Sequence, residues 1–260
     1  DGFDIGGKPL IGQKKANEGI EKMLKQHPEH LSVMAFWVSS QAESPLNGSK
    51  LREEVLPVAR KLVKHLPEYP PYHLMLANVE ARCGNAALAI QAADNAVKFY
   101  KAYMDEEKVN LYDCDGWIRA KVYLAALYEM KGEKIEAEQV GKELAEIKVD
   151  EKRLFSRGAG LLLWEGRNVG ARIMMGRSDL ASFKKGQNIL ETLPEEQWFK
   201  DKSFALPYRN CIAIYLAVRM AIADKDMKSS KVLFDQFLLR VDALGKTQKL
   251  ASKTSSYGDW

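Results

Sequence analysis

The stretch that most constrains the fold lies at residues 67–100, where small residues recur at the spacing of two closely packed helices. These small residues are Ala77, Gly84, Ala89, Ala93 and Ala96. The last three are separated by four and three residues, which places them on one face of a helix. Gly84-Asn85 suits a turn, because both residues tolerate the left-handed backbone conformation that ends a helix. The pattern predicts two antiparallel helices that touch through their small side chains.

The same pattern recurs along the chain. A second copy surrounds Gly132-Glu133 and contains Ala125, Tyr128, Ala137 and Leu144. Val55 and Ala89, at equivalent places in the second helix of a pair, are 34 residues apart. Other intervals are longer, and their surplus falls in stretches such as the turn-rich residues 43–49. A pair that buries only one small face needs further pairs to cover it, so the sequence predicts a series of stacked pairs.

These residues make the unit resemble the tetratricopeptide repeat (TPR), a helix–turn–helix of about 34 residues. The resemblance implies an all-α fold: a right-handed superhelix, or α-solenoid, of antiparallel helix pairs with irregular insertions. We expect about five pairs and a leading helix over residues 13–245. A flexible arm at residues 1–12 is expected to precede them and a polar tail at residues 246–260 to follow them. Gly245 is expected to end the last helix.

The least regular part of the predicted array is residues 150–175. Its apolar pattern is interrupted by Gly158, Gly160, Gly166 and Gly170. Each glycine inside a helix costs about 1 kcal/mol relative to alanine. Four of them together predict close contacts between helices, or a break near Gly166.

Composition places the chain among soluble proteins, with 46% hydrophobic and 28% charged residues. No apolar run reaches the roughly 20 residues of a membrane span. The three cysteines are odd in number and lack CxxC spacing, which argues against a disulfide framework or a zinc site. An odd count favours a reducing compartment such as the cytoplasm. Residue 1 is Asp rather than Met, so we expect that an upstream segment has been removed, and an exported or periplasmic location stays open.

No motif in the sequence carries catalytic chemistry. Leu244-Gly245-Lys246-Thr247 resembles the end of a phosphate-binding loop, but Arg240 stands where that loop requires glycine. Asp113-Cys114-Asp115-Gly116 resembles part of a calcium loop, although apolar residues occupy two of the ligand positions. His27 and His30 have no cysteine or carboxylate at metal-ligand spacing. We therefore expect no enzyme activity, no cofactor and no metal site.

In TPR proteins the first helix of each pair lines the concave face of the superhelix. Carried over to this chain, the resemblance assigns peptide binding to Phe36, Ser39, Leu74, Met75, Asn78, Arg82, Arg119, Val122, Tyr123 and Arg167. These residues mix apolar side chains, which can anchor a ligand, with amide and guanidinium groups that can hydrogen-bond a peptide. TPR co-chaperones clamp a terminal carboxylate with lysine and asparagine. Only Asn78 and Arg119 fit that set here, so recognition of a chaperone tail is doubtful.

The sequence favours a non-catalytic scaffold that binds a peptide or partner segment in a concave groove. One alternative is a basic helical-repeat protein that binds nucleic acid, since the net charge is +4 and the pI is about 8.8. A basic-rich stretch contains Arg157, Arg167, Arg172, Arg177, Lys184 and Lys185. A charge of +4 is small for 260 residues, and the lysines are spread among acids, which argues against this alternative. A further alternative is an interaction domain of a larger enzyme or secretion assembly.

Overall fold

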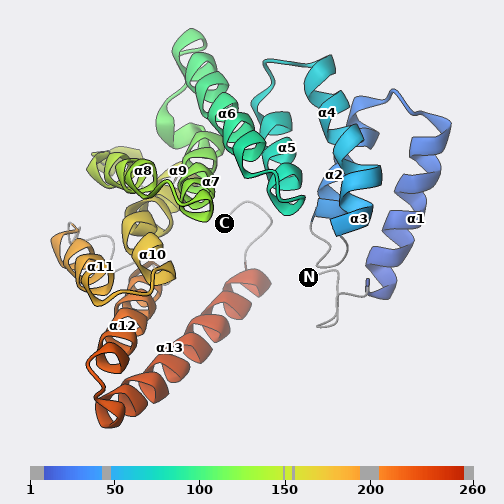
Figure 1. The fold of residues 1–260 in the computed structure, drawn as a ribbon. Coiled ribbons are helices and arrows are strands. Elements are labelled where there is room, and N and C mark those ends of the chain that lie inside the picture. Colours follow the sequence, from blue (N-terminus) through green and yellow to red (C-terminus); the bar gives the residue numbers. More distant parts are fainter. Residues whose placement is uncertain (1–8, 43–47, 149, 154–155, 194–204, 255–260) are drawn as a thin grey trace. The chain divides into compact units, whose positions relative to one another are not determined.

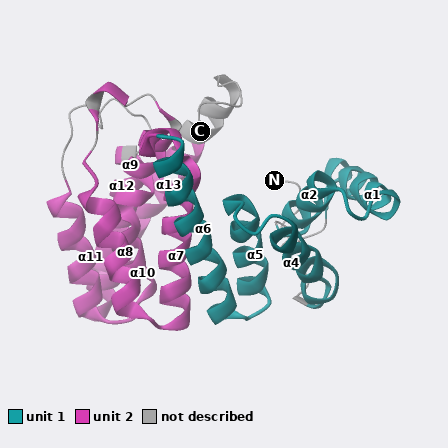
Figure 2. Ribbon diagram, turned by 90° about the horizontal axis from the view of Figure 1, so that it is seen from above, with its two compact units in different colours: residues 1–108 teal, residues 109–260 magenta. Residues whose placement is uncertain are grey.

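The structure is a computed structural model that describes residues 9–42, 48–148, 150–153, 156–193 and 205–254. Within these ranges the chain forms helices and turns and no β-strand, which confirms the expected all-α class (Figure 1). The chain divides into two compact units, residues 1–108 and residues 109–260 (Figure 2). Each unit is described by itself below.

Unit 1 is built from helices that pack in chain order. They are α1 (Ile11–Gln26), α2 (Leu31–Ala42), α3 (Gly48–Lys50), the π-helical segment η1 (Leu51–Val55), α4 (Leu56–His65), α5 (Pro70–Arg82) and α6 (Ala86–Glu106). Figure 1 shows α1, α2, α4, α5 and α6 side by side, and each contacts the next along the chain. The leading helix α1 begins at Ile11, so residues 11 and 12 of the expected flexible arm are helical. Residues 1–8 of that arm lie outside the described residues.

The core of unit 1 holds the small residues that the sequence analysis placed between helices. Ala77, Ala89, Ala93 and Ala96 have no exposed surface, as expected for a close contact between α5 and α6. Gly84 has a φ of +84° in the turn between the two helices, which confirms the predicted left-handed position. Larger apolar side chains, among them Met34, Val38, Val55, Leu62 and Val79, complete the core from α2 to α5.

The helical segment at residues 48–65 changes its hydrogen bonding just before Pro57. Proline has no backbone N–H, so Pro57 cannot donate the hydrogen bond of an α-helix. The Leu56 N–H donates to the carbonyl oxygen of Leu51, five residues earlier. The chain forms the π-helical segment η1 and then starts α4, with Pro57 in the first turn of that helix. Pro57 thus lies at the start of α4, where a missing N–H is tolerated.

Unit 2 begins with the 3-10 turn η2 (Leu111–Asp113) and the pair α7 (Asp115–Lys131) and α8 (Lys134–Glu146), which meet at Gly132 with a φ of +89°. The elements that follow are η3 (Glu151–Arg153), α9 (Arg157–Trp164), η4 (Gly166–Asn168), α10 (Val169–Gly176), α11 (Leu180–Thr192), α12 (Ala205–Ala223) and α13 (Met227–Thr254). In each of the pairs α7–α8, α10–α11 and α12–α13 the two helices pack against each other. Ala125, Ala137 and Leu144 are fully buried in the core of this unit.

The glycine-rich part of unit 2 shows both features that the sequence predicts. The helix breaks at Gly166, where η4 separates α9 from α10. A Cβ atom added at Gly158 would lie 2.4 Å from the carbonyl oxygen of Tyr112, and one added at Gly141 would lie 3.1 Å from the backbone of Gly170. Backbone segments thus approach each other closely where glycine leaves room.

The prediction that Gly245 ends the last helix is wrong. α13 continues through Gly245 to Thr254, so part of the expected polar tail is helical. A single glycine costs a helix only about 1 kcal/mol. The polar residues that follow are compatible with helix, and they allow α13 to continue.

No helix within the described residues is both long enough and apolar enough to cross a membrane.

Candidate functional site

The unit 1 residues assigned to a groove lie on α2 and α5, two helices that contact each other. Phe36 on α2 is 67% exposed, which is unusual for so large an apolar side chain. Ser39 on α2 is half-buried, as are Leu74, Met75, Asn78 and Arg82 on α5. Ala77 and Val79, at other positions around α5, are fully buried. The residues that the resemblance assigns in unit 1 therefore keep part of their surface exposed.

Two of these side chains also have roles within unit 1. The Arg82 guanidinium donates to the backbone carbonyl of Ala42, so it ties the end of α5 to the end of α2. Met75 packs against the core cluster that contains Met34 and Leu62. Phe36, Ser39, Leu74 and Asn78 remain as the residues of this face best suited to a ligand. We call the α2–α5 surface formed by Phe36, Ser39, Leu74, Met75, Asn78 and Arg82 the first-helix face.

In unit 2, the corresponding residues on α7 also keep some exposure. Arg119 is exposed and forms an ion pair with Asp115, one turn earlier, at 3.3 Å. Val122 is half-buried against the core, and Tyr123 is half-buried as well. These residues belong to a different unit from Asn78 and Phe36, so a continuous groove through both sets stays a prediction.

The placement of Arg167 on a groove surface is wrong. Arg167 is only 4% exposed and lies in the 3-10 turn η4, not on a continuous first helix. The helix break at Gly166 changes the phase of the chain, and the carried-over register assumed an unbroken helix. Arg167 is therefore removed from the ligand-contacting set.

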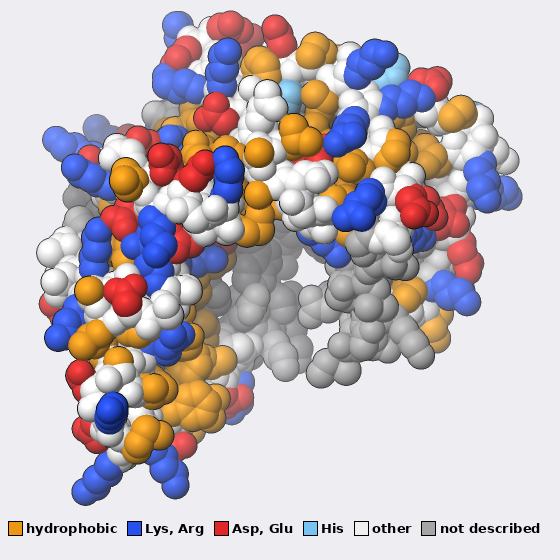
Figure 3. Space-filling view, in the orientation of Figure 1, with side chains coloured by type: hydrophobic (Ala, Val, Ile, Leu, Met, Phe, Trp, Pro, Cys, Tyr) orange, Lys and Arg blue, Asp and Glu red, His pale blue; other side chains and the backbone are white. Residues whose placement is uncertain are grey.

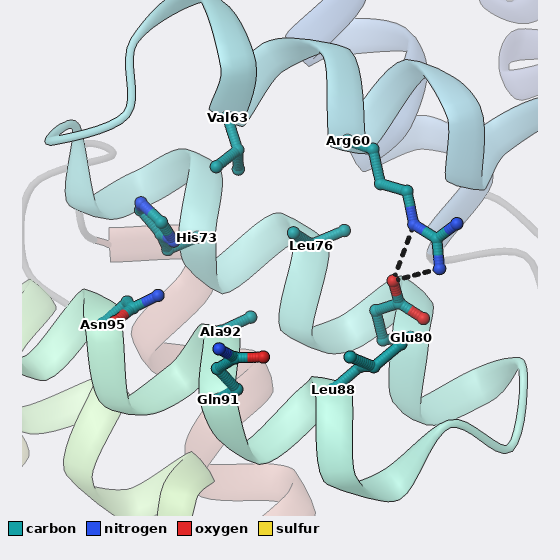
Figure 4. Close-up of a pocket in the computed structure, with 9 residues that line it drawn as sticks. All are labelled: Arg60, Val63, His73, Leu76, Glu80, Leu88, Gln91, Ala92 and Asn95. Carbon is teal, nitrogen blue, oxygen red and sulfur yellow. Dashed lines mark hydrogen bonds and ion pairs between the residues drawn. The ribbon is translucent and has the colours of Figure 1, made fainter.

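The structure contains a pocket that the sequence analysis did not predict (Figure 4). Its α5 residues, His73, Leu76 and Glu80, lie at helical positions opposite those of Leu74, Asn78 and Arg82. The pocket encloses about 260 Å³ between α4, α5 and α6. Its lining residues are Arg60, Val63, His73, Leu76, Glu80, Leu88, Gln91, Ala92 and Asn95. This volume is below the roughly 300–1,000 Å³ of typical small-molecule sites, so it suits a single large side chain better than a cofactor.

One end of this pocket is closed by an ion pair. The Glu80 side chain is only 3% exposed, and its Oε1 accepts from Arg60 Nε at 2.9 Å and from Arg60 Nη2 at 2.8 Å. Asn85 Nδ2 donates to the other carboxylate oxygen at 2.6 Å. A buried carboxylate needs such compensation, because its loss of hydration would otherwise destabilise the fold. Glu80 is thus engaged in structure and is not a free acid or base.

The other end of the pocket carries a buried imidazole and two amides. His73 is 4% exposed, and its Nε2 lies 2.6 Å from the carbonyl oxygen of Pro67. Its Nδ1 is buried without a hydrogen-bond partner. Gln91 and Asn95, one turn apart on α6, line the pocket and keep part of their surface exposed. The amides could bind a peptide backbone beside the apolar walls formed by Val63 and Leu76.

The three cysteines of the chain are buried. Among the described residues, no group of three or more His, Cys, Asp and Glu side chains could hold a metal ion. Cys83, Cys114 and Cys211 are buried, and burial raises the pKa of each thiol above its usual value. Thiols with a raised pKa are poor nucleophiles because little thiolate is present near neutral pH.

Several basic side chains of the stretch at residues 157–185 are buried or paired with acidic residues inside unit 2. Arg167 is buried, and Arg177 binds Glu129 and Glu138 with a side chain that is only 8% exposed. Lys185 also pairs with Glu138. Half of the six basic side chains in the stretch therefore contribute little to a surface that could attract phosphates. Figure 3 shows Lys and Arg interspersed with Asp and Glu over the visible face.

No protein-family model, no curated protein and no solved structure matches this chain.

Proposed function

We propose that this chain is a non-catalytic interaction protein that holds an extended peptide, or a segment of a partner protein, against its first helices. In this proposal the helix pairs are TPR-like and form a right-handed superhelix whose concave side is lined by α2, α5 and α7. The observation that carries the proposal is the first-helix face of unit 1. It combines Phe36 of α2, which is two-thirds exposed, with the half-buried Leu74 and Asn78 of the neighbouring helix α5.

The chemistry of this face suits a peptide. An exposed phenyl ring offers apolar surface that a ligand side chain can cover, and such aromatic anchors carry much of the affinity at interfaces. The Asn78 amide can donate and accept a hydrogen bond at the same time, as a peptide backbone requires. On α7, the Arg119 guanidinium could bind a carboxylate or a carbonyl in place of Asp115, since an exposed ion pair one turn apart is weak.

A pull-down with quantitative mass spectrometry tests the proposal. The full chain is immobilised, and capture from a lysate is compared with that by the double variant Phe36→Ala/Asn78→Ala, before and after nuclease treatment. We expect a protein that is captured by the wild type, lost from the double variant and retained after nuclease. Capture that disappears with nuclease favours the nucleic-acid alternative. Equal capture by both chains contradicts a role for the first-helix face.

The interaction domain of a larger enzyme or assembly remains the second candidate, and it would use the same face. In that case the captured protein and this chain would form one stable complex at equal stoichiometry. Size-exclusion chromatography of the captured material distinguishes a stable complex from a transient encounter.

A further inference from the structure

We draw no further inference here: the strongest candidate, the apolar stripe that Met227, Phe234, Leu238 and Val241 expose on α13, carries nothing, because no feature of the residues that the structure describes shows what covers it.

Discussion

At the scale of single residues, the clearest test of the packing is Gly158 in α9. A methyl group at this position would meet the backbone of Tyr112 at 2.4 Å, and a backbone cannot move aside as a flexible side chain can. Gly158→Ala should lower the free energy of unfolding by about 1–3 kcal/mol through overpacking. Thermal and urea denaturation measure the change.

Gly160 provides the control, because it lies two residues away on the same helix with no atom near its added Cβ. Gly160→Ala should leave stability unchanged or raise it by about 0.5–1 kcal/mol through helix propensity. If the two variants melt alike, Tyr112 does not lie against Gly158 as described.

Ala89 and Ala137 make a second test at this scale. Both have no exposed surface and lie on the second helix of their pair, in α6 and α8. Replacement of either by leucine should destabilise the chain by about 1–3 kcal/mol, because three further carbon atoms must fit where two helices touch. Ala87→Leu on the exposed side of α6 is the control and should stay within about 0.5 kcal/mol of the wild type. Unchanged melting for both core variants would contradict the helix register.

At the scale of elements, Arg177 connects the end of α10 to α7 and α8 in unit 2. Its Nε and Nη2 donate to the two carboxylate oxygens of Glu129 on α7, at 3.1 and 3.0 Å. Its Nη1 donates to Glu138 on α8 at 2.5 Å, and Lys185 on α11 donates to the same carboxylate. Arg177→Ala would leave two partly buried carboxylates near each other. We expect a loss of about 3 kcal/mol, the lower end of the range for broken buried pairs, because these carboxylates are 21% and 29% exposed.

This network also predicts a dependence of stability on pH. Burial alone would raise the pKa of Glu138, but the hydrogen bonds from Lys185 and Arg177 outweigh it and lower the pKa overall. A carboxyl with a lowered pKa in the folded state stabilises the fold above its unfolded value of 4.5, and this stabilisation is lost as the pH falls below that value. The wild type should lose more stability between pH 5 and about pH 3 than Arg177→Ala does. Arg172→Ala, at an exposed position on α10, should follow the wild-type curve. Parallel curves for all three chains would contradict the role of Arg177.

Features set by a few neighbouring residues could be predicted from the sequence. The turns at Gly84 and Gly132 and the buried alanines depend on local backbone preference and helical period, so they were found. Phe36 and Asn78 were assigned from the resemblance to the TPR, and both keep exposed surface. Arg167 was misplaced because the register was carried across the helix break at Gly166.

Features set by contacts between distant residues could not be predicted. At the pocket next to Glu80, Arg60, twenty residues earlier, reaches across from α4 and pairs with the buried carboxylate. A glutamate in a helical pattern is normally expected to face solvent, so the sequence did not indicate that Glu80 is buried. One feature of the sequence pointed to the pocket: Gln91 and Asn95 place two amides one turn apart on α6.

At the scale of the whole molecule, the salt dependence of binding separates the two classes of partner. A nucleic-acid ligand that releases counterions from about 6–10 phosphates would lose about 10³–10⁵ in affinity between 50 and 200 mM salt. A peptide held by Phe36 and Asn78 should lose less than about tenfold over the same range, because exposed ion pairs contribute little. Fluorescence anisotropy with the captured partner segment measures the slope. A steep slope would favour nucleic acid, despite the net charge of only +4.

The central claim, that the partner lies on the first-helix face, is tested most directly by isothermal titration calorimetry of the captured segment with variants on the two sides of α5. Phe36→Ala and Asn78→Ala alter the first-helix face, whereas Gln91→Ala and Asn95→Ala alter the pocket. We predict that the first two weaken binding at least fivefold without a change in melting temperature, and that the last two bind as the wild type does. Binding lost with Gln91→Ala and Asn95→Ala, but kept with Phe36→Ala and Asn78→Ala, would contradict the claim and move the partner to the pocket between α4, α5 and α6.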